Sequence, residues 1–277
     1  MRSIRTFPAF NRKYRKLCKS KTCHTVFGRQ GTLTFPLGDD VMGPILFHTG
    51  EHQYTESVWA LSRIRHMGYR TDNFWDIGAN IGHIGLGLLK ERLVRHVTAI
   101  EPSVVLGEYL DENVRQSYWQ DDVRVLNLAV GDRNDLVWFK PNDANFGDGR
   151  VYSDIPTESV LDASWVLSMR LSNLILRDVD KKPDVVWMDV QGREGLVLRG
   201  SSGWLVGIPT VMEVWPAGMR ETDVSLSEFS QACRENWSNF QVIGSDTVHP
   251  ISRLPRLLQQ YSGRRFGRSK HADVLFW

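Results

Sequence analysis

Apolar strands and amphipathic helices alternate along most of this chain from residue 73 onward. The predicted strands cover residues 73–77, 97–100, 123–129, 136–139, 185–189, 210–215, 240–243 and 273–277, and the predicted helices cover residues 81–92, 103–117, 193–199 and 224–235. Such alternation is typical of a mostly parallel sheet that carries helices on both faces. Ligands of these sheets bind beyond the carboxyl ends of the strands. The residues that directly follow each strand are therefore the candidates for function.

The composition is that of a folded protein. Hydrophobic residues make up 42% of the 277 residues and charged residues 24%, which excludes global disorder, collagen and coiled-coil architectures. No run of 18 apolar residues is present, so we expect no membrane-spanning helix. Three cysteines do not make a disulfide framework, and we expect a reduced, cytoplasmic protein.

The N-terminal part has a different character. Residues 1–24 contain eight Lys and Arg and no Asp or Glu, and we interpret them as a basic arm. Two short β-like pieces follow, Thr32–Phe35 and Pro44–Phe47, which indicate a small hairpin or lid before a helix over residues 55–67. We therefore expect a basic arm with a small β segment over residues 1–50 and one main domain over residues 51–277.

A second cluster of positive charge lies near the other end of the chain. Residues 253–270 contain six Lys and Arg and no acid, although the net charge of the whole chain is only +2. Basic ends of this kind can bind nucleic acid, anionic lipid or a phosphorylated acceptor. Solvated charge without a partner is the alternative interpretation.

A glycine loop follows the first strand of the alternating region. It reads Asp76-Ile-Gly-Ala-Asn-Ile-Gly82, and its glycines would let the backbone approach a ligand closely. Glu101 ends the next strand, 19 residues after Gly82, where a carboxylate can accept hydrogen bonds from both hydroxyls of a ribose. A glycine loop and an acid at this spacing indicate a nucleoside cofactor, whereas a tight turn with a surface glutamate is the structural alternative.

Two nucleoside cofactors have to be distinguished. A nicotinamide dinucleotide requires G-x-G-x-x-G, whose amides bind a pyrophosphate. Here the pattern is Gly78-x-Asn80-x-Gly82, and the acid Asp76 at the entrance of the loop would repel a pyrophosphate. The same charge suits the ammonium and sulfonium groups of S-adenosyl-L-methionine (SAM), which is the cofactor we expect.

These motifs resemble those of the class I SAM-dependent methyltransferases, and among them the FkbM family. The resemblance covers roughly residues 50–277 and is carried by residues 54–56, 76–82, 101–103, 127–132, 189–194 and 198–200, by Glu213 and by residues 273–276. It implies a Rossmann-like α/β fold whose seven-stranded, mostly parallel sheet has an antiparallel last strand.

The resemblance also implies roles for single residues. Asp76, Gly78, Asn80 and Gly82 would hold the methionine part of SAM, Glu101 would bind the ribose, Ser103 and Ala129 would border the adenine, and Glu56 would contact the amino group. One position departs from the family pattern Asp-Val-Glu-Gly-x-Glu, because Gln191 stands at the first Glu. The pocket thereby loses one negative charge, which leaves a catalytically inactive SAM-binding module as an alternative.

Methyl transfer to a hydroxyl requires in-line positioning and a general base. Asp189, at the end of a strand, is the expected base, and a cofactor-binding or helix-capping role is the alternative. Glu194 and Glu213 complete the catalytic candidates, and all three carboxylates could supply oxygen ligands to Mg²⁺. Their spacing is not diagnostic of a metal.

The acceptor is less well defined by the sequence. The run Asp189-Val-Gln-Gly lacks the Asn/Asp-Pro-Pro-aromatic pattern of amino-group methylases of DNA. We therefore expect O-methylation of a hydroxyl on a sugar, a glycolipid or a secondary metabolite, with RNA ribose 2'-O-methylation as the alternative motivated by the basic ends. The irregular stretch 140–165 is expected to cover the acceptor site.

Overall fold

The computed structural model describes residues 8–152, 163–174, 182–265 and 268–277. The strands are β1 (Cys23–Gly28), β2 (Gly31–Pro36), β3 (Asn73–Ile77), β4 (His96–Ile100), β5 (Val123–Leu126), β6 (Ala129–Gly131), β7 (Asp135–Lys140), β8 (Arg150–Tyr152), β9 (Ser164–Arg170), β10 (Val185–Met188), β11 (Thr210–Val214), β12 (Asn239–Val242), β13 (Val248–Pro250), β14 (Arg264–Arg265), β15 (Arg268–Ser269) and β16 (Ala272–Phe276). The helices are α1 (Pro8–Cys18), α2 (Met42–Thr49), α3 (Tyr54–His66), α4 (His83–Lys90), α5 (Val104–Gln116), α6 (Glu194–Ser201), α7 (Pro216–Met219), α8 (Leu226–Asn236) and α9 (Leu254–Tyr261).

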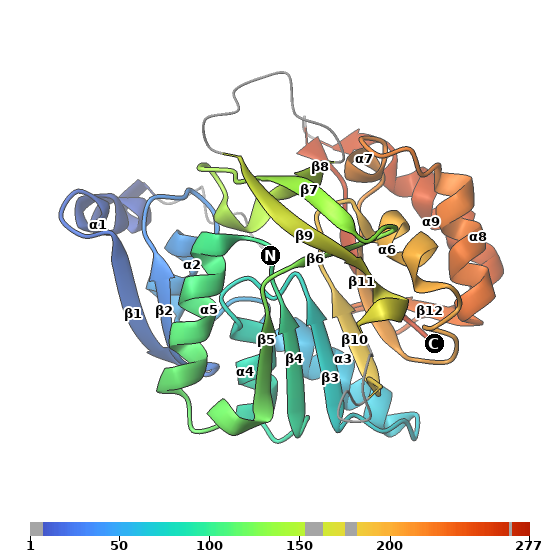
Figure 1. Cartoon of the computed structure of the whole chain (residues 1–277), viewed down its shortest axis with the longest axis horizontal. Helices are drawn as coiled ribbons and strands as arrows, with labels where there is room; N and C mark the ends of the chain where they lie inside the picture. Colours follow the sequence, from blue (N-terminus) through green and yellow to red (C-terminus); the bar gives the residue numbers. More distant parts are fainter. Residues whose placement is uncertain (1–7, 153–162, 175–181, 266–267) are drawn as a thin grey trace.

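The main sheet has the predicted topology (Figure 1). Its strand order is β13-β12-β16-β11-β10-β3-β4-β5, and the five strands from β11 to β5 are parallel to their neighbours. The last strand in the chain, β16, lies antiparallel between β11 and β12. A short eighth strand, β13, extends the edge beyond the seven that were expected.

Alternate residues of each central strand face two different hydrophobic layers. Phe74 and Trp187 pack on the side of α3, α4 and α5, whereas Trp75, Ile77 and Met188 pack on the side of α6, α8 and α9. This is the period of two that a pleated strand imposes. Because both faces are covered, the central strands contain continuous apolar runs, as the sequence suggested.

A second sheet of order β6-β9-β7-β8 crosses above the main sheet (Figure 1). Here the predicted elements need correction. The strand expected over residues 123–129 is interrupted, because β5 ends at Leu126 and β6 begins at Ala129 in the other sheet. The strand expected over residues 136–139 is β7, and the stretch 140–165, predicted to be irregular, contains β8 and the start of β9. Residues 153–162 of that stretch lie outside the described residues.

The N-terminal part contains the expected hairpin, β1 paired with β2. One other expectation for it was wrong. Pro44–Phe47 lies in helix α2, whose first turn is capped by the carboxylate of Asp39, which accepts hydrogen bonds from the backbone N–H groups of Met42 and Gly43, both at 2.8 Å. Pro44 is tolerated because the first turn of a helix needs no intrahelical N–H partner.

The basic arm is not a free extension over the residues that the structure describes. Residues 8–18 form α1, and Tyr14 on this helix is only 2% exposed. Its hydroxyl donates a hydrogen bond to Asp39 at 3.2 Å and accepts one from the N–H of Gly38 at 3.1 Å. Residues 1–7 lie outside the described part of the chain.

The N-terminal segment and the main domain share one hydrophobic core. Leu33 and Phe35 of β2 belong to the same buried cluster as the residues of α4 and α5. The side chain of Asn113 on α5 binds both backbone groups of Thr34, accepting from its N–H at 2.7 Å and donating to its carbonyl at 3.0 Å. The core therefore continues across the boundary that we drew after residue 50. Among the helices described, none is long and apolar enough to span a membrane.

Candidate functional site

A cavity of about 790 Å³ lies at the carboxyl ends of the central strands, below the second sheet. Its floor includes the glycine loop after β3. Gly78 has a positive φ of +87°, and a Cβ at this position would lie 2.0 Å from the backbone oxygen of Asp189. Only glycine therefore permits this close approach of the loop to the end of β10. The loop is fixed by the N–H groups of Gly78 and Ala79, which both donate to Ile100 at 2.8 and 3.0 Å.

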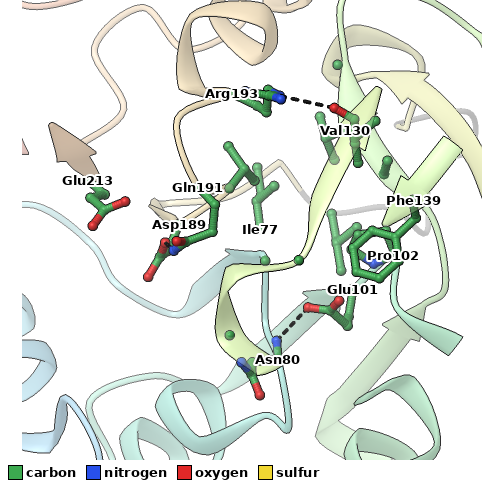
Figure 2. A pocket seen from close by; sticks show the side chains of 18 of the residues that line it. Ile77, Asn80, Glu101, Pro102, Val130, Phe139, Asp189, Gln191, Arg193 and Glu213 are labelled. Carbon is green, nitrogen blue, oxygen red and sulfur yellow. Dashed lines mark hydrogen bonds between the residues drawn. The ribbon is translucent and has the colours of Figure 1, made fainter. Parts of the chain in front are cut away.

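Glu101 is held rigidly at one side of the cavity (Figure 2). One carboxylate oxygen accepts from the N–H of Asn80 and the other from the N–H of Ser103, both at 2.8 Å. Burial raises the pKa of Glu101 to about 7, with a smaller contribution from the charge of Asp189, while the two N–H donors act in the opposite direction. The cavity thus contains a fixed carboxylate with lone pairs still available to a ligand.

The rest of this half of the cavity is mostly apolar. Asn80 lines it in a left-handed conformation (φ 55°), and the buried Oδ1 of this side chain has no hydrogen-bond partner. Ala129 lines the cavity as well. The other apolar lining residues of this half are Ile77, Ile100, Leu106, Leu128, Val130, Val137 and Phe139. An apolar wall beside one fixed carboxylate and an unpartnered amide oxygen is a suitable environment for a nucleoside.

Four of the predicted cofactor residues do not line the cavity. Asp76 is buried beneath the loop, where its carboxylate accepts a hydrogen bond from the N–H of Gly85, and burial raises its pKa to about 8. Gly82 is the N-terminal cap residue of α4, and Ser103 caps α5 by accepting from the N–H of Leu106 at 3.2 Å. Glu56 lies in the first turn of α3, close enough to Asp273 for their charges to interact. In this structure these residues shape the loop and its helices, and their contact with a cofactor stays a prediction.

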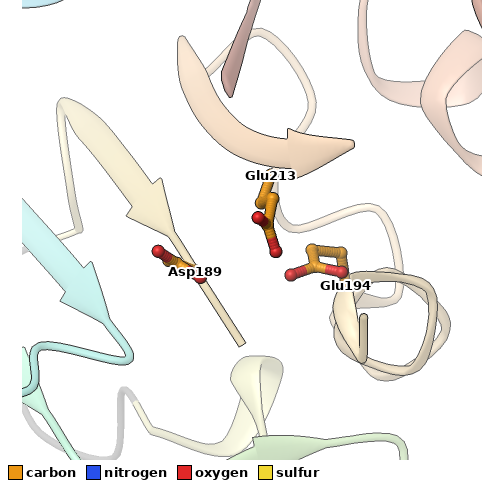
Figure 3. Close-up of side chains that lie close together, drawn as sticks. All are labelled: Asp189, Glu194 and Glu213. Atoms are coloured by element: carbon orange, nitrogen blue, oxygen red, sulfur yellow. The ribbon is translucent and has the colours of Figure 1, made fainter. Parts of the chain in front are cut away.

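The three catalytic candidates come together in the other half of the cavity (Figure 3). Asp189 follows β10, Glu194 begins α6 and Glu213 lies in β11, and one carboxylate oxygen of each lies within 4.8 Å of the others. Asp189 and Glu213 line the cavity, and Glu194 is fully buried next to them. Burial raises the pKa of all three carboxyl groups, to about 8 for Glu194.

The polar contacts of this cluster are few. Gln191 donates a side-chain hydrogen bond to Asp189, and Glu194 accepts from the N–H of Val190 at 3.1 Å. The second carboxylate oxygens of Glu194 and Glu213 are buried without a hydrogen-bond partner. His271 lies 4.0 Å from Glu213.

Gln191 has a defined role here that the family pattern did not suggest. It adopts a left-handed conformation (φ 55°) and points its amide nitrogen at Asp189. A glutamate could not donate this hydrogen bond and would place a further negative charge beside Asp189. The departure from the family pattern therefore leaves Asp189 in place rather than disrupting the cluster.

Two histidines that were not predicted as site residues lie in the cavity wall. His52 precedes α3 and His83 begins α4, and their rings approach to 3.2 Å between Nδ1 of His52 and Nε2 of His83. Gln53 lies 3.3 Å from His83. Burial lowers the pKa of both histidines, to about 4 for His52, so both are neutral at physiological pH. Only the position of His83 directly after the glycine loop hinted at the site.

The mostly parallel sheet with its antiparallel last strand β16, and a cavity with Glu101 on one side and carboxylates of β11 and the end of β10 on the other, define a Rossmann-like class I methyltransferase fold. A family model described as the methyltransferase FkbM domain matches residues 76–219, just over half of the 277-residue chain. The chain belongs to this family of methyltransferases.

Solved structures resemble the chain only distantly. Methyltransferase FkbM from Methylobacillus flagellatus KT is 12% identical, with a TM-score of 0.47 over 75% of this chain and 44% of that protein. A putative transferase from Pyrococcus horikoshii is also 12% identical, with a TM-score of 0.46 over 93% of this chain and 71% of the other. The chain thus spans less than half the length of the Methylobacillus protein. No curated protein matches it.

Proposed function

We propose that this protein uses SAM to methylate a hydroxyl group of a small-molecule or glycan acceptor. The observation that carries the proposal is the division of one cavity into a nucleoside half around Glu101 and an acidic half around Asp189 (Figure 2). SAM contains both a nucleoside and a reactive methyl group on the adjoining sulfur. Its nucleoside would occupy one half of the cavity, and its methyl group would face the other half.

The nucleoside half fits SAM in its donors, acceptors and shape. Glu101 would accept hydrogen bonds from the ribose hydroxyls with the lone pairs that its two backbone donors leave free. The unpartnered Oδ1 of Asn80 would accept from the ammonium group, and the backbone of Gly78, which lines the cavity, would lie beside the methionine chain. Ala129 and Phe139 supply apolar surface for the adenine. When bound, SAM supplies an electrophilic methyl group.

The acidic half would bind the acceptor and take its proton. Asp189 is the proposed base, because it lines the cavity and burial makes it more basic than an exposed aspartate. Asp189 would accept the proton of the acceptor hydroxyl, whose oxygen would take the methyl group from the sulfonium of SAM, with S-adenosylhomocysteine as the leaving product. Glu194 and Glu213 would position the hydroxyl group through their unpartnered oxygens.

The charge of the acidic half bears on the class of acceptor. A sugar, a glycolipid headgroup or a secondary metabolite offers neutral hydroxyls, which carboxylates bind without repulsion. The aromatic rings of Phe146 and Tyr152 line the same cavity and could contact the face of a sugar ring. RNA is the second candidate, favoured by the exposed cations of α1, Arg12, Lys13, Arg15 and Lys16. Its phosphates would be repelled by the acidic half, so we place it behind the neutral acceptors.

The cofactor assignment is tested by calorimetric titration with SAM and S-adenosylhomocysteine. Glu101→Gln should weaken binding by about tenfold or more, because the variant loses a charge-assisted acceptor and turns an N–H donor toward backbone N–H groups. Glu108→Gln on the exposed face of α5 is the matched control and should bind like the wild type. A folded wild-type protein that binds neither nucleoside would contradict the proposal.

The acceptor assignment needs a separate experiment. Mixtures of protein, SAM and candidate glycans or alcohols are assayed for S-adenosylhomocysteine, with RNA and amines in parallel. We expect release with a hydroxyl acceptor and strong loss of release in Asp189→Asn, while SAM still binds. Turnover only with amines would overturn the hydroxyl assignment, and SAM binding without any turnover would favour an inactive binding module.

A further inference from the structure

Three carboxylates converge on one point in the acidic half of the cavity. The nearest oxygens of Asp189, Glu194 and Glu213 all lie within 4.8 Å of one another (Figure 3). They come from three different places: the residue directly after β10, the first residue of α6 and the next-to-last residue of β11. Because β10 and β11 are adjacent parallel strands and α6 follows β10, the fold itself fixes this convergence.

Two of the carboxylates leave an oxygen with no protein partner in a place without water access. Glu194 is 0% exposed and Glu213 is 9% exposed, and the Oε2 atom of each is buried and lacks a hydrogen bond. An unpaired buried carboxylate oxygen loses its hydration without compensation, which is costly unless a cation or a donor occupies the site. Figure 3 shows both groups turned toward the space that they share with Asp189.

Positive charge from the protein is scarce around the cluster. Among the residues that the structure describes, the ion pair to these three carboxylates is that of His271 with Glu213 at 4.0 Å, and this histidine is 60% exposed. Arg193, the nearest arginine in sequence, instead turns to Val151, donating to its carbonyl at 3.1 Å, and stacks over Tyr152. Within the described part of the chain, the cluster therefore has no lysine or arginine at ion-pairing distance, although Arg193 is close enough to Glu194 for their charges to interact.

We propose that Asp189, Glu194 and Glu213 form a binding site for one hard divalent cation of the Mg²⁺, Mn²⁺ or Ca²⁺ class. All three ligands are oxygens, the type that these ions prefer. A point equidistant from three atoms 4.8 Å apart lies about 2.8 Å from each, so small rotations of the side chains would give the 2.3–2.6 Å of a Ca²⁺–oxygen bond or the shorter Mg²⁺ distance.

The remaining coordination positions would face the cavity. Asp189 and Glu213 line it, so water or an acceptor hydroxyl could complete the coordination shell from that side. The site does not depend on SAM or on methyl transfer, because it rests on the geometry and burial of the carboxylates alone. If methyl transfer occurs, a cation bound at this site would lie in the half of the cavity that is proposed to bind the acceptor.

The test is a titration of the full-length, metal-free protein with Mn²⁺, followed by calorimetry and by the loss of the free-ion electron paramagnetic resonance signal. We expect one ion per chain, displaced by Mg²⁺ or Ca²⁺ but not by Na⁺. Glu194→Gln and Glu213→Gln should each weaken Mn²⁺ binding by about tenfold or more, since affinity follows the number of charged ligands. Circular dichroism checks the fold of each variant.

Glu101→Gln is the matched control, because it removes a buried carboxylate from the opposite half of the same cavity. It should keep the Mn²⁺ affinity and lose SAM affinity, and Glu213→Gln should show the reverse. A folded wild type that binds no Mn²⁺, or glutamine variants that bind it as well as the wild type, would overturn the proposal. Mn²⁺ binding without SAM binding would instead contradict only the proposed function.

Discussion

Glu101 is a carboxylate with two backbone donors and a pKa near neutrality, which makes its charge sensitive to physiological changes of pH. Burial raises its pKa to about 7. If the ionised form binds the ribose, SAM affinity should fall as the pH drops below 7, by up to about tenfold per pH unit. Calorimetry at pH 6, 7 and 8 measures this. An affinity that rises toward low pH would contradict the assignment of Glu101 to the ribose.

The buried carboxyl group of Asp76 leads to a prediction about the stability of the protein rather than about ligand binding. Its pKa is raised from 3.8 to about 8 in the folded protein, so the native state holds a proton that the unfolded state releases above its ordinary pKa. Between these two pKa values the free energy of unfolding should therefore fall as the pH rises. The fall is at most about 1.4 kcal/mol per pH unit. Asp76→Asn should flatten this part of the pH profile in urea unfolding.

This prediction is decided by comparing how steeply the free energy of unfolding changes with pH in three proteins. The wild type and Asp76→Asn are unfolded at pH 5, 6.5 and 8, and Asp111→Asn on the exposed side of α5 serves as the control with the wild-type slope. Equal slopes for all three proteins would show that Asp76 does not hold the excess proton.

The residues of the site differ in how well the sequence predicted them. Gly78, Asn80, Glu101 and Asp189, which line the cavity, were predicted from the sequence because they lie just beyond the ends of strands, and the carboxyl ends of parallel strands meet at one edge of a sheet. His52 was not found, because it lies before a helix and reaches the cavity only through its packing against His83. Direct contacts were expected of Asp76 and Gly82, but the spacing of a loop does not say which of its residues face the ligand.

At the level of elements, helix α2 depends on a single cap. Asp39 accepts from the N–H groups of Met42 and Gly43 and also from the hydroxyl of Tyr14, so it ties α1 to the first turn of α2. Asp39→Ala should lower the free energy of unfolding by about 1–2 kcal/mol, as expected for loss of a cap. Because Met42 lines the cavity, SAM binding should weaken with it.

The matched control for this prediction is the neighbouring surface pair. Arg15 lies 4.0 Å from Asp40, and both side chains are well exposed, so Arg15→Ala should change stability by less than about 1 kcal/mol. Urea denaturation followed by circular dichroism measures both variants. Equal effects of the two substitutions would mean that Asp39 does not act as a cap.

The elements themselves were predicted where the pattern is local. The helices α3, α5 and α8 follow an apolar period of three to four residues, and their predicted bounds differ from the observed ones by a residue or two. For helix α2 the sequence predicts a strand instead, because the run Pro44–Phe47 is short and entirely apolar. Only Asp39 indicates that a helix begins there. No strand is predicted over β9, which begins within the stretch 140–165 and continues beyond it, because its pairing with β6 and β7 is a long-range contact without a local pattern.

For the whole molecule, the position of the cavity between two sheets predicts a cooperative response to ligand. Its lining includes residues of β3, β4, β6, β7, β8 and β9. At 100 times the dissociation constant, a ligand adds about 2.7 kcal/mol to the free energy of unfolding, or roughly 5–10 °C in the melting temperature of a domain of this size. SAM should therefore raise the melting temperature of one single unfolding transition in calorimetry. Two transitions, of which only one moves, would show that the second sheet unfolds independently.

The order of the strands has a consequence for how this protein is made. The strand β16 lies between β11 and β12, although it follows every other strand of the main sheet in the chain. Until residues 272–276 emerge from the ribosome, β11 and β12 have no common neighbour, and the apolar edge of β11 remains open to pairing with other chains. The sheet is thus completed only after all its other strands have been synthesised, so we expect the emerging chain to need protection of this edge until β16 is in place.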